Sequence, residues 1–370
     1  MKRFILITAL LLASAVAGAQ IVPRMVIIEN DLLKYYLDHS DYNPNDYTYT
    51  NIFLPAQRQR WDSPAPVTFS WKEKLGDAVL EIRENRSDPI PFQAVEIQPR
   101  SRSCQVYNLI PGRRYYYSLV DVKGNSEYEH GSFFVEGRRR MIRADNVRNI
   151  RDFGGMVTDD GHTLRYGIMY RGACLDWATR SGQVDTIFTK EGWKVLHDLL
   201  QIRADIDLRS DLELNLTDDN PANDMDHCPL GPDVEHHHYS MSAFGGIQTS
   251  GRYGPALRCI LDCIKRGKNV FIHCAAGADR TGAISFLLGG MAGVCETDLA
   301  RDYELTCMSK STPKHTRNSD KPYYYAASVA YLKENFEGNT LSEKIQDYLI
   351  KKQGITREQI TEFQRIIVDD

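Results

Sequence analysis

The sequence predicts an α/β domain with a mainly parallel central sheet flanked by helices, preceded by an all-β sandwich. Two observations predict this organisation. From about Pro64 to Val135, short alternating segments are separated by Pro/Gly turns, as in a sandwich. From about residue 141 onward, strand-like segments alternate with segments whose apolar residues have helical spacing. We therefore expect a leader at 1–19, a sandwich with an N-terminal extension at 20–140 and an α/β domain at 141–370.

The N-terminal residues MKRFILITALLLASAVAGAQ have the pattern of a signal peptide. Lys2 and Arg3 are followed by an apolar run from Phe4 to Val16 and by the small residues Ala17-Gly18-Ala19. The run is shorter than the roughly 20 residues of a membrane-spanning helix, so we favour cleavage over a retained anchor. We expect an exported protein, periplasmic or secreted, with no stable membrane span after cleavage.

Within the predicted sandwich, the strand segments are VTFSWK, DAVLEIRE, SCQVYNL, RRYYYSLVDV and SFFVEG. The segment NLIPGRRYYYSLV places a leucine, a Pro-Gly turn and a tyrosine-rich strand in succession. It resembles the corner of a fibronectin type III domain, over about seventy residues. The sequence does not identify a binding partner for this domain.

In the second half, the predicted helices and strands alternate before the chain becomes helical. FTKEGWKVLHDLLQI is a predicted helix that begins near Thr189, and RADIDLR is the following strand. PALRCILDCIKRGK is a helix, NVFIHC a strand and TGAISFLLGGMAG a helix. Four further helices are predicted in TDLARDYELTCMS, YYYAASVAYLKENF, LSEKIQDYLIKKQ and TREQITEFQRIIV.

The segment FIHCAAGADRTG connects the predicted strand to the next helix. The strand from Asn269 delivers Cys274 to the carboxyl end of the sheet, and small residues follow it, Ala275, Ala276, Gly277 and Ala278, before Asp279 and Arg280. Small residues allow backbone N–H groups to converge on an anion, and the helix N-terminus adds further donors. Arg280 offers a guanidinium fork for phosphate oxygens, and a thiol in that field ionises readily to a nucleophilic thiolate. The spacing therefore predicts phosphoryl transfer.

This Cys-x5-Arg-Thr pattern resembles the signature loop of the protein tyrosine phosphatase superfamily. NVRNIRDFGGMVTDDGHTLRYGIMYRGACL is similar to a segment of the atypical bacterial tyrosine/lipid phosphatases, and IDLRSDLE and LIKKQGITREQITEFQRII also resemble that branch. The resemblance covers about residue 144 to the end. It implies a mainly parallel sheet flanked by helices, no metal and no cofactor.

The resemblance also implies roles for the loop residues. Cys274 would attack phosphorus and form a cysteinyl-phosphate, and Arg280 would bind the phosphoryl oxygens together with the backbone of residues 275–280. Thr281 either donates its hydroxyl to the thiolate or is an ordinary residue at a helix start. We expect His273 to orient the loop through a backbone hydrogen bond and not to act as a base.

The general acid is predicted to be Asp207 or Asp279, with Asp211 as the third candidate. Asp279 lies in the loop itself, and loop aspartates are typical of the resembled branch. Asp207 ends a neighbouring strand, where a salt bridge with Arg209 or Arg151 is its alternative role.

Three further residues are predicted to support the loop. Arg151 and Asp152 belong to an Arg-Asp-x-Gly-Gly turn that requires an ion pair and positive-φ positions. Arg171 ends a strand and either reaches the substrate phosphate or pairs with Asp152.

For the substrate, we expect a phosphorylated protein or a small phosphomonoester, with phosphotyrosine favoured and dual specificity left open. The resembled loop often carries a lysine where this chain has Ala278, which argues against polyphosphorylated lipids. Inositol phosphates and phosphoinositides remain alternatives. A formal net charge of −4 argues against a nucleic-acid partner.

Two other classes of protein are alternatives. A phospho-binding module without catalysis would have a missing or misplaced general acid. A sulfur- or arsenate-handling enzyme would need a resolving thiol, for which Cys174 and Cys307 are candidates. The sequence EHHHYSM also suggests a metal site, but strand alternation would separate His237 from His236 and His238, so we predict none.

Overall fold

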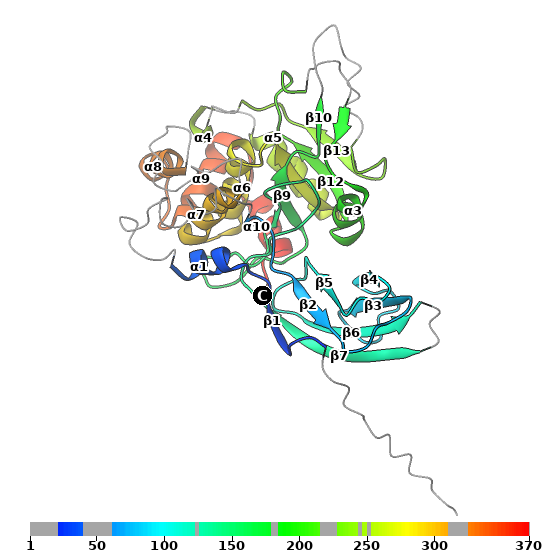
Figure 1. The fold of residues 1–370 in the computed structure, drawn as a ribbon. Helices are drawn as coiled ribbons and strands as arrows, with labels where there is room; N and C mark the ends of the chain where they lie inside the picture. Colours follow the sequence, from blue (N-terminus) through cyan, green and yellow to red (C-terminus); the bar gives the residue numbers. More distant parts are fainter. Residues whose placement is uncertain are drawn as a thin grey trace, which may run out of the picture. The chain divides into compact units, whose positions relative to one another are not determined.

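The computed structural model describes residues 21–39, 61–122, 126–178, 184–214, 228–242, 246–249, 253–309 and 325–369. The predicted leader at 1–19 lies outside these residues. The described residues belong to two compact units (Figure 1). The first comprises Met1–Val26, Thr68–Gln105 and Arg114–Phe134, and the second comprises Ile27–Val67, Val106–Arg113 and Val135–Asp370.

The first unit is built from strands of two sheets. The larger sheet has the order β1-β7-β6-β3-β4, and β2 pairs with β5 in the smaller one. The strands are β1 Met25–Ile27, β2 Val67–Ser70, β3 Ala78–Arg83, β4 Gln93–Ile97, β5 Ser103–Val106, β6 Arg114–Asp121 and β7 Glu127–Glu136. Sequence analysis missed β4, where prolines precede the strand and only Ile97 is buried. The five strand segments that it did predict are present.

Aromatic side chains join the two sheets of this unit. Phe69 on β2 makes edge-on contacts with Tyr117 on β6 and Phe133 on β7, with ring centroids 5.5 Å apart in each pair. Leu80 and Leu119 are buried beside them, on strands whose alternate residues face inward. The first unit therefore has its own hydrophobic core.

The second unit is an α/β structure around a five-stranded sheet with the order β13-β12-β14-β9-β8. Its strands are β8 Arg151–Asp152, β9 Met169–Ala173, β12 Ile202–Asp207, β13 Glu235–His238 and β14 Asn269–Cys274. β13, β12, β14 and β9 run parallel, whereas β8 pairs antiparallel with β9. The sheet is thus mixed, with parallel strands at its centre, where the sequence predicts a mainly parallel one. A separate antiparallel pair joins β10 Asp176–Ala178 to β11 Val184–Thr186.

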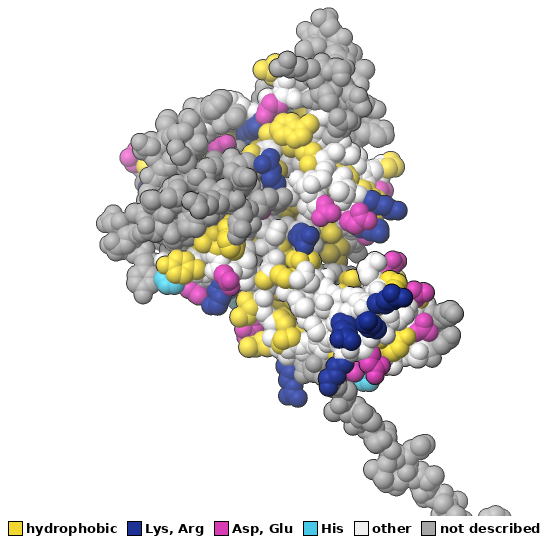
Figure 2. Space-filling view, viewed as in Figure 1, with side chains coloured by type: hydrophobic (Ala, Val, Ile, Leu, Met, Phe, Trp, Pro, Cys, Tyr) yellow, Lys and Arg dark blue, Asp and Glu magenta, His cyan; other side chains and the backbone are white. Residues whose placement is uncertain are grey.

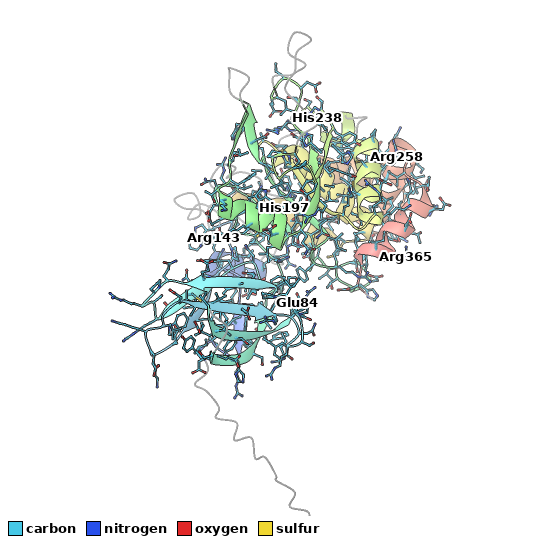
Figure 3. The ribbon with its side chains drawn as sticks, turned by 90° about the vertical axis from the view of Figure 1, so that its right-hand side faces the viewer. Glu84, Arg143, His197, His238, Arg258 and Arg365 are labelled. Carbon is cyan, nitrogen blue, oxygen red and sulfur yellow. The ribbon has the colours of Figure 1, made fainter. Side chains whose placement is uncertain are left out.

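The helices of the second unit cover both faces of this sheet. They are α1 Asp31–His39, α3 Lys190–Trp193, the π-helix η2 Lys194–Leu199, α4 Gly246–Thr249, α5 Tyr253–Lys265, α6 Asp279–Ala292, α7 Glu296–Leu305, the 3₁₀ helix η3 Thr306–Met308, α8 Tyr325–Asn335, α9 Leu341–Gln353 and α10 Arg357–Ile367. On one face of the sheet, Phe271 of β14 packs in the cluster that contains η2. On the other face, its neighbours Val270 and Ile272 pack in the cluster that contains α5 and α6. Figure 3 shows the two sides, marked by His197 on η2 and Arg258 on α5.

The central helix of the second unit is α6, which is almost entirely buried. At Gly290, an added Cβ would lie 2.3 Å from the side chain of Ile345, so only glycine allows α9 to pack this closely. Among the described residues, no helix combines the length and the apolar run that crossing a membrane requires.

Two boundaries differ from the sequence-based expectation. The helix predicted in residues 188–202 ends earlier, because η2 stops at Leu199 and β12 begins at Ile202. The sequence analysis places residues 20–140 in the N-terminal domain and predicts no helix there, but α1 belongs to the second unit, where its Tyr36 is buried with Leu305 and Met308. The Tyr36 hydroxyl also donates a hydrogen bond to Glu304 (2.7 Å). The chain thus contributes to the second unit well before residue 141.

The described surface carries charges of both signs. Figure 2 shows Lys and Arg side chains interspersed with Asp and Glu over the face that it draws. This pattern agrees with the small net charge of −4.

Candidate active site

The signature loop, Cys274–Arg280, connects β14 to α6 at the carboxyl end of the parallel strands. Gly277 has φ +65°, and an added Cβ there would lie 2.2 Å from the carbonyl oxygen of Gly172 on β9. Only glycine permits both this backbone conformation and this close approach. The sequence prediction that Cys274 lies at a strand end before a helix is confirmed.

Two side chains bind the carbonyl groups of the loop. Asn149 Nδ2 donates to the carbonyls of Ala276 (3.2 Å) and Gly277 (2.9 Å), and Arg171 Nη2 donates to Gly277 (2.8 Å). When carbonyls are bound by the surrounding protein, the N–H groups of a curled loop remain for an anion. The first turn of α6 is also open, since its N-cap residue Ala278 provides no side-chain cap.

A buried aspartate on α7 holds the arginines around the loop. Asp302 pairs with Arg139 (2.9 Å), Arg151 (2.9 Å) and Arg171 (2.6 Å). Burial would raise the pKa of Asp302, but Arg151, Arg171 and Arg139 lower it well below its usual value. Arg151 Nη1 also donates to Asn149 Oδ1 (2.6 Å), so the same cluster orients the asparagine.

Pairing with Asp152, one of the two roles that the sequence analysis gives for Arg171, is not found. Asp152 is buried against Arg140 (3.0 Å) and accepts from the N–H groups of Gly154 and Gly167 (both 2.9 Å). The reason is strand geometry, because adjacent residues of β8 point to opposite sides of the sheet. Arg151 therefore faces Asp302 while Asp152 faces away from it.

Cys274 is buried, and its thiol is nevertheless easier to ionise than a free cysteine. Burial raises its pKa, but the charge of Arg280 and the backbone N–H groups of Thr281 and Ala278 lower it below 9.0 overall. The Thr281 hydroxyl is buried and has no hydrogen-bond partner among the described residues, so its role at the thiolate stays a prediction beside that of an ordinary helix-start residue.

Arg280 is oriented by a residue that the sequence analysis did not single out. Its Nη1 and Nη2 atoms donate to the two carboxylate oxygens of Glu213, the second at 2.9 Å. Burial raises the pKa of Glu213, but the hydrogen bond from Arg280 lowers it to about 2. The Nε–H group of Arg280 is buried and has no hydrogen-bond partner among the described residues. It is therefore available to an anionic oxygen at the loop.

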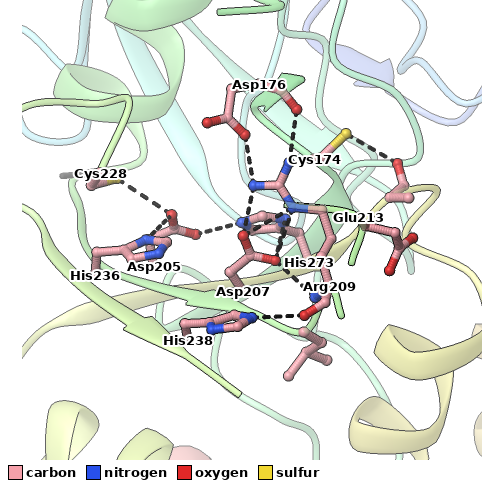
Figure 4. Close-up of polar contacts among 12 residues, drawn as sticks. Cys174, Asp176, Asp205, Asp207, Arg209, Glu213, Cys228, His236, His238 and His273 are labelled. Carbon is pink, nitrogen blue, oxygen red and sulfur yellow. Dashed lines mark hydrogen bonds and ion pairs between the residues drawn. The ribbon is translucent and has the colours of Figure 1, made fainter. Parts of the chain in front are cut away.

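His273 lies between two buried aspartates under the loop (Figure 4). Its Nε2 is 3.0 Å from Asp205, and its Nδ1 is 3.8 Å from Asp207. Burial lowers the pKa of His273, but Asp205 and Asp207 raise it to about 9. The sequence analysis predicts a backbone hydrogen bond from this ring, but neither ring nitrogen has a hydrogen-bond partner among the described residues. The ring instead forms ion pairs with the two aspartates, because Asp207 lies opposite His273 in the register of β12 and β14.

Asp207 is completely buried and bound by a guanidinium. Arg209 Nε and Nη2 donate to its carboxylate at 2.6–3.0 Å, and the same arginine pairs with Asp176 (2.6 Å). Burial raises the pKa of Asp207, but His273 and Arg209 lower it. The structure thus gives Asp207 the salt bridge with Arg209 that the sequence analysis named as its alternative role.

The other two acid candidates lie elsewhere. Asp279 occupies the first turn of α6, half-buried, five residues after Cys274. Asp211 is exposed, with Oδ1 at 3.8 Å from His238 Nδ1. Of the three candidates, Asp279 is the one in the signature loop itself.

The three histidines of β13 alternate in direction as predicted. His236 Nδ1 contacts Asp205 (3.1 Å), and His238 Nε2 contacts the carbonyl of Arg209 (2.7 Å). His237 points to the other face, toward Glu235 and Cys263. The three rings therefore do not converge on one ion.

Among the cysteines outside the signature loop, Cys174 contacts the loop backbone. Its Sγ contacts the carbonyl of Ala275 (3.2 Å), and burial raises its pKa to about 12. Cys174 is therefore a protonated donor. Cys307, the other candidate resolving thiol, is buried in the cluster around Tyr36.

Three residues of the site escaped the sequence analysis: Asn149, Glu213 and Asp302. Asn149 and Glu213 lie inside the two segments that resemble phosphatases. The resemblance therefore marked these segments, but it did not indicate what either residue does. Asp302 had no local signal, since its partner Arg151 is 151 positions away.

A family model described as "Tyrosine phosphatase family" matches residues 142–369, more than half of the chain. The chain belongs to the tyrosine phosphatase family. The α/β unit is thus the phosphatase domain, and the protein is a tyrosine-phosphatase-like enzyme that acts on phosphorylated substrates.

Solved structures similar to this phosphatase include two proteins. One is the core catalytic domain of the PP-IP phosphatase SIW14 from S. cerevisiae in complex with citrate, which is 17% identical, with a TM-score of 0.26. The match covers 40% of this chain and 77% of the SIW14 chain. A cysteine-to-serine variant of TpbA from P. aeruginosa in complex with pTyr is 15% identical, with a TM-score of 0.26. The match covers 45% of this chain and 89% of TpbA. A comparison with curated proteins finds no match.

Proposed function

We propose that this phosphatase hydrolyses phosphomonoesters, phosphotyrosine first among them, through a phosphoryl group carried on Cys274. The observation that carries the proposal is the pairing of a thiol of lowered pKa with a buried, unpartnered Arg280 Nε–H. A phosphate monoester is the anion that both groups suit, since the thiolate attacks phosphorus and the guanidinium binds its oxygens.

In the first step, the Cys274 thiolate attacks phosphorus, the S–P bond forms and the bond to the ester oxygen breaks. Asp279 donates a proton to that oxygen, and the leaving group departs as an alcohol or a phenol. Arg280 and the loop N–H groups balance the charge on the three phosphoryl oxygens.

In the second step, water attacks the cysteinyl-phosphate and the S–P bond breaks. Asp279, now a carboxylate, accepts a proton from the water, and the thiolate leaves toward the Thr281 hydroxyl. The enzyme returns to its starting state with inorganic phosphate as the second product, and no metal enters either step.

Asp279 is the general acid in this proposal, and Asp207 is a positioning residue. His273 and Arg209 keep Asp207 ionised despite its burial, and Arg209 occupies its carboxylate, whereas Asp279 is half-buried in the loop that surrounds the thiol. Asp279→Asn should therefore slow hydrolysis of alkyl phosphates much more than that of nitrophenyl phosphate, whose leaving group needs no proton.

The substrate preference rests on Ala278. A lysine at that position would add a charge for a second phosphate, and its absence favours esters with one phosphoryl group. Phosphotyrosine is favoured, with phosphoserine and phosphothreonine next, and inositol phosphates or phosphoinositides are the alternative.

We also propose that the enzyme is exported and that its first unit is a fibronectin type III-like sandwich. The leader pattern supports export, and N-terminal sequencing of the mature protein from cell fractions tests it. The contacts of Phe69 with Tyr117 and Phe133, which join two sheets, support the sandwich.

The test of the proposed function is hydrolysis by the leader-free protein with a chelator present. The substrates are phosphotyrosine and phosphoserine peptides, inositol phosphates and phosphoinositides. Cys274→Ser should abolish turnover, whereas Cys295→Ser, at a half-buried cysteine outside the loop, should retain it. If no substrate is turned over while vanadate still binds, the protein binds phosphate without catalysis and the proposal fails.

A further inference from the structure

A cluster of three metal-binding side chains lies on the face of β13 opposite to His236. Cys259 and Cys263 are four residues apart on α5 and so lie on one face of the helix, toward His237 on β13. One ligand atom from each residue lies within 4.8 Å of the other two. Two thiols and an imidazole are the donors that zinc prefers in proteins.

The distances in this cluster approach those of a tetrahedral site. Zn–S bonds of about 2.3 Å and Zn–N bonds of about 2.0–2.1 Å place the sulfur and nitrogen of two ligands about 3.6 Å apart. Cys263 Sγ lies 3.7 Å from His237 Nε2. This edge of a tetrahedron is therefore already present in the protein.

A fourth donor lies beside the same two atoms. Glu235 Oε2 is 3.3 Å from His237 Nε2 and 3.9 Å from Cys263 Sγ, where tetrahedral coordination requires about 3.4 and 3.6 Å. Arg266 donates to both oxygens of this carboxylate, from Nη1 to Oε1 (2.7 Å) and from Nη2 to Oε2 (2.8 Å), and Lys268 pairs with Oε1 (2.5 Å). These two cations would balance the surplus negative charge of two thiolates and a carboxylate around one Zn²⁺.

We propose that His237, Cys259 and Cys263 bind one zinc ion, with Glu235 as the fourth ligand. The ion links the edge strand β13 to α5 and thereby stabilises the α/β unit. It shares no ligand with the Cys274 loop, so the proposal is independent of the phosphatase chemistry.

The environment of the ligands agrees with this assignment. The side chain of His237 is 30% exposed, which gives an ion access from solvent. The sequence analysis rejected a site made of three histidines and did not consider a mixed set of histidine and cysteine ligands.

The experiment measures metal binding by the reduced protein. All variants carry Cys274→Ser, so that the active-site thiol contributes nothing. Zinc content is measured after purification without chelator, and Co²⁺ is then titrated into the metal-free protein and followed by its sulfur-to-cobalt charge transfer and visible d–d bands. The test variant is Cys259→Ser/Cys263→Ser, and the matched control is Cys295→Ser.

We expect one zinc per chain and an intense tetrahedral Co²⁺ spectrum in the parent and in Cys295→Ser. Both should be lost in the double variant, and Glu235→Gln should weaken affinity by about 10- to 100-fold. Zinc at a hundredfold excess over its Kd should raise the Tm by roughly 5–10 °C in the parent and leave the double variant unchanged.

Three results would overturn the proposal. One is reduced parent protein that binds no stoichiometric zinc or cobalt, and another is equal binding by the double variant. The third is a Cys259–Cys263 disulfide in freshly isolated protein that persists in its native compartment. If the double variant does not fold, His237→Ala provides the same comparison with both thiols intact.

Discussion

At Cys274, burial and charge act in opposite directions on the thiol. Burial alone would keep it protonated, and Arg280, Thr281 and the loop backbone reverse that effect. The same contacts can stabilise the thiolate when it leaves phosphorus in the second step. Ionisation of the Cys274 thiol and its release from phosphorus therefore depend on the same few groups.

Removing the Thr281 hydroxyl should raise the pKa of Cys274. A hydrogen bond to a charged group contributes about 1.5–3 kcal/mol, so Thr281→Ala should shift this pKa upward by roughly one to two units. The rate of alkylation by iodoacetamide as a function of pH measures it, and Thr281→Ser should restore the original profile. An unchanged profile in Thr281→Ala would show that the hydroxyl does not act on the thiolate.

Glu213 should act through Arg280 and not through the reacting atoms. Glu213→Gln keeps an acceptor but removes the charge, so we expect kcat/KM to fall by about 10-fold because the guanidinium is less firmly oriented. The matched control is Glu296→Gln, at an exposed glutamate that pairs with Lys333. An equal fall in kcat/KM in both variants, or no fall in Glu213→Gln, would show that Glu213 does not orient Arg280 for catalysis.

At this scale, the sequence predicts residue identity better than residue partners. Cys274, Arg280, Thr281 and Asp279 lie together as the spacing implies, because the strand, the loop and the helix are consecutive in the chain. The partners of Arg171 and Arg151 come from α7, and no local pattern in the sequence indicates which distant carboxylate an arginine meets.

At the scale of elements, the carboxyl ends of β12, β13 and β14 form a buried charged layer under the loop (Figure 4). Asp205 and Asp207 face His273, and His236 contacts Asp205 from β13. Arg209 completes the layer, since it binds Asp207. Because each charge has an opposite neighbour, the layer holds the strand ends together without an unpaired buried ion.

The pairing of His273 with Asp205 and Asp207 should make the free energy of unfolding depend on pH. The pKa of His273 is about 9 in the folded protein and about 6.5 unfolded, so the protonated ring stabilises the fold fully below pH 6.5. That contribution, about 3 kcal/mol, should be lost as the pH rises from 6.5 through 9. Urea unfolding at a series of pH values measures it.

The control for this prediction is His130→Gln, at an exposed histidine of the first unit, which should keep the slope. His273→Gln should lower stability at neutral pH and flatten the dependence between pH 6.5 and 9. Equal slopes in His273→Gln and in the parent would contradict the assignment.

The element-scale predictions from sequence succeed where periodicity is strong and fail where it is weak. The C-terminal helices α9 and α10 match their predicted ranges closely because both carry capping boxes, at Thr340 and Thr356. Strand β4 was missed because only one of its residues is buried. The short antiparallel β8 was not foreseen either, since two residues carry no periodicity.

At the scale of the whole molecule, the chain forms two units, each with its own core. We therefore expect two calorimetric unfolding transitions. Vanadate, as a phosphate analogue at a hundredfold excess over its Kd, should raise the Tm of the α/β unit by roughly 5–10 °C. The Tm of the first unit should not change. A single transition that shifts as one would contradict separate unfolding.

The central claim is that phosphate is transferred to Cys274 before water accepts it. The most direct measurement is rapid acid quenching of the enzyme during turnover of a phosphotyrosine peptide, followed by mass spectrometry of its own peptides. The account predicts one phosphoryl group on the peptide that contains Cys274, present in Asp279→Asn and absent in Cys274→Ser. Phosphate on another residue, or sustained turnover by Cys274→Ser, would contradict it.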